Sequence, residues 1–137
     1  WWSENGRIGF AHRRLSIVEL SSSGHQPMID RAGQISLVFN GEIYNHNDLR
    51  QQLINKGHLF KSKSDSEVII AAWKEWREDC VNHFNGMFSF AIYDEVSQVI
   101  FLASHLSILP YPSTLMFFFI HILSERSVFI IFFSSCI

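Results

Sequence analysis

The sequence is poor in cysteine, proline and net charge, and each shortage excludes a class of protein. Its 137 residues include two cysteines and three prolines, and the net charge is −2. Cys80 and Cys136 form neither a disulfide framework nor a CxxC pair, so we expect a reducing, cytoplasmic setting. The basic residues are scattered, so we expect no nucleic-acid partner. The first residues have no basic stretch before an apolar core, so we expect no signal peptide.

The composition changes near residue 104. Residues 1–103 mix charged, glycine and apolar residues, whereas residues 104–137 contain one acid, Glu125, and one base, Arg126. Two apolar runs, 115–123 and 128–133, are each too short to span a bilayer, and joining them would place both charges near its middle. We therefore expect no membrane span. We interpret residues 104–137 as an aberrant apolar tail and not as native domain sequence; a membrane anchor is the alternative.

Residues 8–103 contain separate strand patterns and helix patterns. Apolar runs predict strands over 8–17, 35–39, 87–95 and 99–103. Apolar residues at helical spacing predict helices over "DLRQQLINK", with Asn45 or Asn47 as its cap and Gly57 as its end, and over "EVIIAAWKEW". Ser64 and Glu67 form a capping-box pattern before the second helix. Strands followed by helices and a hairpin indicate an α+β fold with helices packed on a sheet.

The apolar run Leu37-Val38-Phe39 ends at Asn40-Gly41, and this dipeptide has two interpretations. Asn-Gly is the most common sequence of a two-residue hairpin turn. However, no strand of matching length follows, because a capped helix begins almost at once. Alternatively, the side-chain amide of Asn40 and the backbone N–H of Gly41 are two donors that could stabilise one negatively charged oxygen.

Three charged residues extend the second interpretation. Arg14, Glu42 and Asp65 could each be an ordinary surface residue. Arginine also grips carboxylates with two parallel hydrogen bonds, and two acids together could hold an ammonium group. With the Asn40-Gly41 donors, this set would fit an α-amino acid that carries a reactive side-chain carbonyl. Spacing along the sequence does not show that these residues converge.

Four motifs, in order, resemble the glutaminase domain of glutamine-dependent asparagine synthetase, a class II glutamine amidotransferase. They are "HRRLSIVELSSSGHQPM", "LVFNGEIYNHNDLR", "GHLFKSKSDSEVIIAAW" and "FNGMFSFAIYD", and the similarity covers residues 9–103. The resemblance implies an N-terminal-nucleophile hydrolase fold, a four-layer αββα sandwich. It would be incomplete here, with its first strand missing, so that residues 1–103 form a partial domain.

The resemblance also implies a role for each residue. In the family, an N-terminal cysteine attacks the side-chain amide of glutamine and its own α-amine serves as the base. Asn40 and Gly41 would stabilise the oxyanion, and Arg14 would bind the glutamine carboxylate. Glu42 and Asp65 would hold the glutamine amino group. Main-chain groups around three further residues would help to line the pocket: Leu15, Ile17 and Val18.

The chain also departs from the family pattern. Position 1 is Trp1 and not cysteine, so we expect the nucleophile to be missing and this fragment alone to be inactive. Cys80 lies in a segment that is not catalytic in the family, and we interpret it as a small packed residue. The Ser-Gly-Gly-x-Asp-Ser loop of the ATP-binding domain does not occur, so we expect no cofactor here, with ATP and Mg confined to an absent synthetase domain. The histidines lack the spacing of metal ligands, so we expect no metal.

We therefore predict a fragment of a glutamine-dependent asparagine synthetase. Its substrate would be glutamine, and its partner would be the synthetase domain, where released ammonia amidates an adenylated aspartate. Full-length members of the family are often homodimers. Two alternatives remain: a non-catalytic glutamine-binding or tail-anchored interaction module, and a fragment of a related amidotransferase with another acceptor.

Overall fold

The computed structural model describes residues 1–3, 6–13, 26–105, 117–123 and 128–134. In chain order the elements are β1 (Ile8–Arg13), β2 (Met28–Ile29), β3 (Ile35–Ile43), α1 (His46–Asn55), α2 (Asp65–Trp76), the 3₁₀ helix η2 (Arg77–His83), β4 (Gly86–Asp94), β5 (Val99–His105), β6 (Phe117–Leu123) and β7 (Val128–Ser134). Among the described residues, no helix combines the length and the apolar character needed to cross a membrane.

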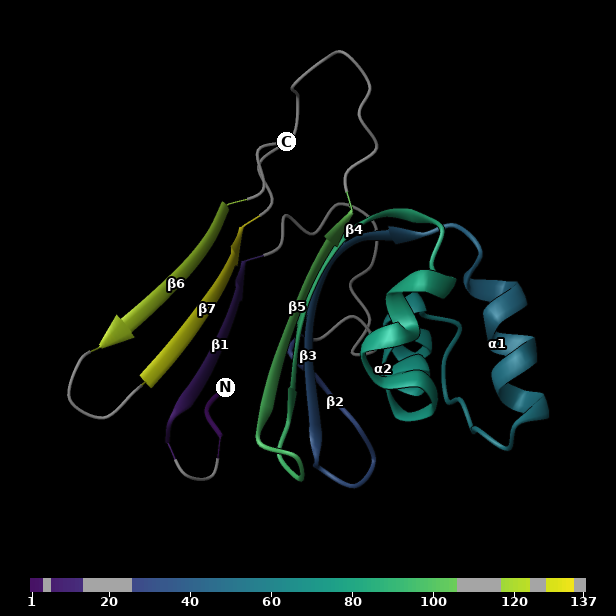
Figure 1. The fold of residues 1–137 in the computed structure, drawn as a ribbon, viewed down its shortest axis with the longest axis horizontal. Helices are drawn as coiled ribbons and strands as arrows, with labels where there is room; N and C mark the ends of the chain where they lie inside the picture. The colour runs from purple at the N-terminus through teal and green to yellow at the C-terminus, as the bar shows by residue number, and fades with distance from the viewer. Residues whose placement is uncertain (4–5, 14–25, 106–116, 124–127, 135–137) are drawn as a thin grey trace, which may run out of the picture.

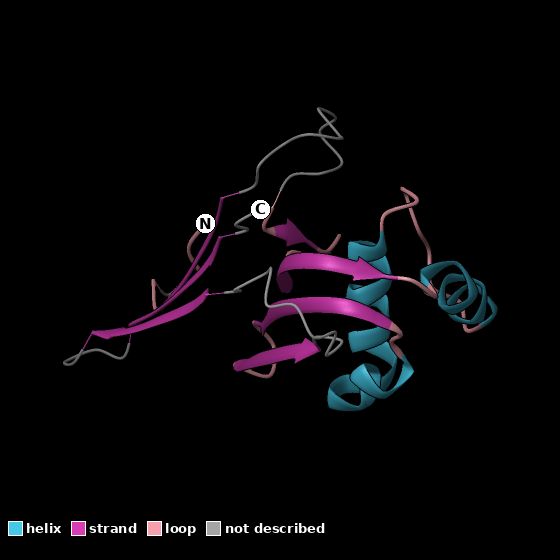
Figure 2. Ribbon diagram, turned by 90° about the horizontal axis from the view of Figure 1, so that it is seen from above, coloured by secondary structure: helices cyan, strands magenta, loops and turns pink. Residues whose placement is uncertain are grey.

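The strands form two sheets. One is antiparallel, in the order β2-β3-β4-β5, and the other has the order β1-β7-β6, with β1 parallel to β7. Helix α2 lies against one face of the four-stranded sheet, with α1 beside it on the same side, and the three-stranded sheet lies on the other side (Figures 1 and 2). This arrangement confirms the predicted α+β class. Strands β6 and β7 lie within residues 104–137, and the interpretation of this segment as a non-native tail stays a prediction.

The two central strands of the four-stranded sheet, β3 and β4, are largely buried on both faces. Successive side chains of a strand point to opposite sides, so each strand contributes to two cores. Leu37 of β3 and Phe90 of β4 join the larger core on the helix side, together with Trp73 of α2. On the other face, Val38 joins a smaller cluster that contains Phe10 of β1. We call this second surface the inter-sheet face. Because β4 is buried on both faces, apolar residues occur on both of its sides and its sequence hardly alternates. The strand was predicted from this feature.

The predicted caps of the two helices differ in outcome. At α2, the Ser64 hydroxyl accepts a hydrogen bond from the N–H of Glu67 at 3.4 Å, which confirms the predicted cap. At α1, Asn45 occupies the cap position, but its side chain makes no capping bond. It instead donates to the carbonyl of His83 and accepts from the N–H of Asn85, each at 2.9 Å. The asparagine therefore ties the start of α1 to the start of β4.

The predicted end of the strand over 35–39, which is β3 in the structure, is wrong. Strand β3 does not stop at Phe39 but continues through Asn40, Gly41 and Glu42 to Ile43. All nine of its residues pair in register with β4, so Asn40-Gly41 is not a hairpin turn. The partner strand β4, distant in the sequence, overrides the local turn preference of this dipeptide.

Two glycines allow β3 and β4 to approach closely where this extension ends. A Cβ atom on Gly41 would lie 2.2 Å from the carbonyl oxygen of Met87, and one on Gly86 would lie 2.1 Å from that of Glu42. Gly41 also has φ +121°, which residues with a side chain rarely adopt. Both positions therefore require glycine, because the main chain of the opposite strand occupies the space of a side chain.

We expect Gly41→Ala to lower the free energy of unfolding by more than about 2 kcal/mol, because it adds a main-chain clash to backbone strain. Gly33→Ala is the matched control, since Gly33 has φ +74° and open space around it. That variant should lose only about 1 kcal/mol from the positive φ. Urea unfolding followed by circular dichroism measures both values, and equal losses would contradict the role of the close strand approach.

Candidate functional site

The outer edge of β3 carries a row of backbone N–H groups that point away from β4. The N–H groups of Ile35, Phe39 and Ile43 are bonded to side chains of Asp30, Gln26 and Asp65. The N–H of Leu37 faces β2, with which this residue is paired. Because N–H directions alternate along a strand, the N–H of Gly41 belongs to the same row.

Gly41 is the open position in this row. Within the part of the chain that the structure describes, its N–H has no bonded partner, whereas those of Phe39 and Ile43 on either side are bonded at 2.7 and 3.4 Å. An exposed and fixed N–H group of this kind can donate to an oxygen of a bound molecule. The row therefore presents one donor, held between two bonded neighbours.

Gln26 holds the strand just before this donor. Its side-chain oxygen accepts from the N–H of Phe39, and its side-chain nitrogen donates to the carbonyl of the same residue, both at 2.7 Å. The amide group thus takes the place of a neighbouring strand. This role of Gln26 was not predicted from the sequence. A glutamine beside a proline carries no local signal of a contact with a residue 13 positions away.

Asn40 and Glu42 lie on the inter-sheet face. Both follow Val38 at intervals of two, and Val38 packs in the inter-sheet cluster. The side chain of Asn40 leaves the face of the sheet, and the N–H of Gly41 leaves its edge. An oxyanion pair requires two donors that converge on one oxygen, and that oxygen would lie at the corner between face and edge.

Asp65 lies beside the end of β3. One carboxylate oxygen accepts from the N–H of Ile43 at 3.4 Å, and Asp65 also opens helix α2. Burial raises the pKa of Asp65, although the bonds from the N–H groups of Ile43 and Ser66 and the nearby His46 act in the opposite direction. The His46 ring is held near this strand end, since its Nδ1 lies 2.8 Å from the carbonyl oxygen of Ile43. The structure therefore brings Asp65 to the strand end that carries Asn40, Gly41 and Glu42.

The other four predicted site residues are not placed. Arg14, Leu15, Ile17 and Val18 lie outside the described residues. Their proposed contacts with a ligand therefore stay predictions.

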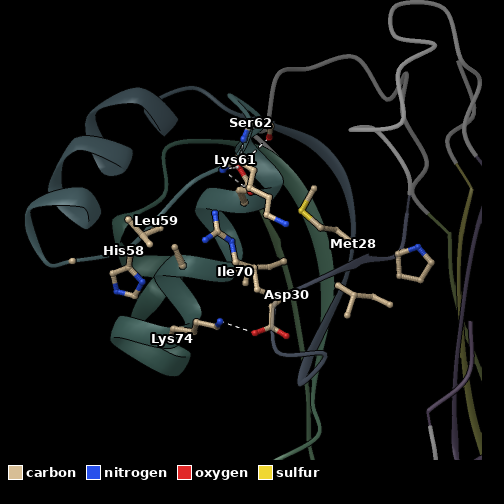
Figure 3. Close-up of a pocket in the computed structure, with 14 residues that line it drawn as sticks. Met28, Asp30, His58, Leu59, Lys61, Ser62, Ile70 and Lys74 are labelled. Atoms are coloured by element: carbon tan, nitrogen blue, oxygen red, sulfur yellow. Dashed lines mark hydrogen bonds and ion pairs between the residues drawn. The ribbon is translucent and has the colours of Figure 1, made fainter.

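A cavity of about 940 Å³ lies elsewhere, between β2, the loop 57–62 and helix α2. Its wall includes the ion pair of Lys74 and Asp30, 2.6 Å apart, and also His58, Leu59 and Met28 (Figure 3). None of the predicted site residues lines it. The cavity and the strand-end site are therefore separate features.

Cys80 is fully buried in η2. Burial raises the pKa of its thiol to about 12, and Glu78 and Asp79 add to the increase. A thiol of this kind is a poor nucleophile, because the thiolate is the reactive form. The described residues also include no cluster of three or more histidine, cysteine or acidic side chains that could hold a metal ion.

Comparison with known sequences assigns a class to this arrangement. The sequence pattern of the glutamine amidotransferase domain family matches residues 1–111, so the chain belongs to that family. Among its curated relatives, asparagine synthetase [glutamine-hydrolyzing] 3 of Bacillus subtilis (strain 168) is 41% identical over 104 residues, a match that covers 74% of this chain and 17% of the relative. Asparagine synthetase [glutamine-hydrolyzing] 1 of Arabidopsis thaliana is also 41% identical, over 68% of this chain and 16% of its own length.

Two further matches are an amidase and a solved structure. Amidase chry2 of Gibberella zeae is 39% identical, over 75% of this chain and 15% of the relative. Among solved structures, glutamine phosphoribosylpyrophosphate amidotransferase from B. subtilis shares 27% identity over 51% of this chain and 18% of its own, with a TM-score of 0.43, too low to support a fold assignment. The chain thus spans about a sixth of the curated relatives it matches, at 15–17% of their length. The predicted family resemblance is confirmed.

The raised pKa of Asp65 predicts a pH dependence of stability. The folded state holds this proton to a higher pH than the unfolded chain, so the free energy of unfolding should fall as pH rises from 3.8 through the raised pKa. Asp65→Asn removes this decline. The difference in free energy of unfolding between this variant and the unaltered chain should therefore shift in favour of the variant as pH rises from 3.8 to about 7. Asp48→Asn, at an exposed acid in the first turn of α1, is the control. Urea unfolding across this range measures the slopes, and an unchanged slope in Asp65→Asn would contradict the prediction.

The burial of Cys80 predicts an inert thiol. In a Cys136→Ser background, which leaves one thiol, we expect no reaction of the folded protein with Ellman's reagent at about pH 8. Unfolding in urea should release one reactive thiol per chain. Rapid labelling of the folded protein would show that Cys80 is accessible and would reopen its role as a nucleophile.

Proposed function

We propose that this chain is the glutamine-binding part of the glutaminase domain of a glutamine-dependent asparagine synthetase. The register of β3 supports this proposal most directly, because it directs the N–H of Gly41 to the outer edge, between the bonded N–H groups of Phe39 and Ile43. The family membership supports it independently. The finer fold assignment, a four-layer αββα sandwich of the N-terminal-nucleophile hydrolases, belongs to the same proposal.

Each polar group has a task in this proposal. Asn40 and Gly41 donate to the side-chain carbonyl oxygen of glutamine and stabilise the negative charge that develops there during amide cleavage. Glu42 and Asp65 accept from the ammonium group of glutamine, and Arg14 holds the carboxylate with a two-pronged contact. The ionised form of Asp65 binds the ammonium group. The partly buried carboxylate, which costs stability when it is ionised without a cation beside it, would gain a charged partner when glutamine binds.

The cleavage step itself requires a nucleophile that we do not assign within this chain. Cys80 is fully buried and its thiol has a high pKa. We therefore propose that the described residues bind glutamine and that the thiol of Cys80 does not cleave it. ATP and magnesium would bind to a separate synthetase domain, which would be the partner that receives ammonia in the cytoplasm, in an enzyme that forms homodimers.

A second function keeps the chemistry of the site and changes the acceptor. Amidase chry2 is among the relatives, and its identity to this chain is close to that of the asparagine synthetases. A related amidotransferase that amidates another carboxylate would use the same glutamine site. The glutamine pocket alone does not choose the acceptor, and a non-catalytic glutamine-binding module would also retain it.

We expect isothermal titration calorimetry to detect binding of L-glutamine to the purified chain. Glu42→Gln should weaken it roughly tenfold or more, because it removes a charged partner of the ammonium group. Glu78→Gln makes the same charge change at an exposed acid of η2 and should leave binding unaltered. The absence of glutamine binding would overturn the proposal.

A further inference from the structure

A row of three polar side chains crosses the inter-sheet face at the end of the site. Asn40 of β3 is paired with Ser89 of β4, which is paired in turn with Ser104 of β5. Residues that are paired across antiparallel strands point to the same face of the sheet. The preceding row on this face contains Val38 and Ala91, which are buried and apolar. The polar row therefore begins where the apolar packing between the sheets ends.

Ser89 is the unusual member of this row. It is 0% exposed, and within the described part of the chain its hydroxyl makes no hydrogen bond. A buried hydroxyl without a partner costs free energy, and native structures contain few of them. Alanine would fill the same position without this cost. The hydroxyl therefore has no structural use in the form of the protein described, although it lies next to Asn40.

The position of Ser89 matches a requirement of Asn40. An asparagine amide carries an acceptor oxygen and a donor nitrogen of almost equal size, and it can be turned either way. To donate to a ligand oxygen, Asn40 must keep its own oxygen, Oδ1, directed elsewhere. Side chains opposite one another on paired strands have Cβ atoms about 5 Å apart, which brings a serine hydroxyl within reach of the amide of an asparagine.

We infer that Ser89 is a positioning residue for the amide of Asn40. When a ligand with a side-chain carbonyl enters the site, the Ser89 hydroxyl donates to Oδ1 of Asn40. This bond turns Nδ2 and its hydrogens toward the ligand oxygen, which lies beside the N–H of Gly41. The inference rests on the proposed function, and it adds a source of specificity, because the orientation of the amide matters only for a ligand with an oxygen at that place.

The test compares two amino acids that differ at the side-chain amide. L-Glutamine carries the carbonyl, and L-norleucine has an aliphatic chain without one. In calorimetric titrations of the full chain, Ser89→Ala should weaken L-glutamine binding by roughly five- to tenfold, the effect of one lost hydrogen bond. Its affinity for L-norleucine should stay unchanged. Ser36→Ala removes a buried hydroxyl from the same face, far along β3 from Asn40, and should alter neither affinity.

Two additional variants separate positioning from simple structural loss. Ser89→Cys keeps nearly the same volume with a weak donor, and it should give an intermediate loss of L-glutamine affinity. In Asn40→Ala, which has no amide to orient, a further Ser89→Ala change should have no effect. Equal weakening of both ligands, additive losses in the double variant, or L-glutamine affinity within twofold of the unaltered chain would each overturn the inference. Failure of the unaltered chain to bind L-glutamine would instead overturn the proposed function on which it rests.

Discussion

The in-register pairing of β3 with β4 is the constraint on which the rest of the described structure depends. The ladder joins nine residues of each strand without a shift, from Ile35 opposite Asp94 to Ile43 opposite Gly86. A shift of one residue would move every side chain of the strand to the other face. The same register that buries Leu37 against the helices therefore also places Asn40 and Glu42 on the inter-sheet face, and it directs the N–H of Gly41 to the open edge.

Stability and binding make opposite demands on this strand end. A protonated or neutral side chain at position 65 would suit the folded state better, since burial raises the pKa of Asp65. An ionised carboxylate is what an ammonium group would require. Ser89 shows a similar conflict, because its buried hydroxyl has no bonded partner in the described part of the chain. Such costs are typical of residues kept for binding and not for packing.

The parts of the fold predicted from the sequence are those specified by nearby residues. Helix α2 and its Ser64 cap follow from spacing within one segment, and so does the β4–β5 hairpin. The end of β3 was predicted wrongly, because Asn40-Gly41 favours a turn locally and only β4 makes it part of a strand. The contact of Asp65 with the end of β3 spans 22 residues, and spacing alone could not reveal it. The family resemblance supplied that grouping, since it carries long-range information that local patterns lack.

The side chains along the outer edge of β3 have a consequence for self-association. Beyond the two-residue strand β2, this edge would present free N–H groups to any extended segment of another chain. Asp30, Gln26 and Asp65 occupy these groups one by one, and a polypeptide cannot add as a strand while they remain in place. Gly41 lies between two of these occupied positions. The side chains that hold the site in place therefore also oppose the addition of another strand along this edge.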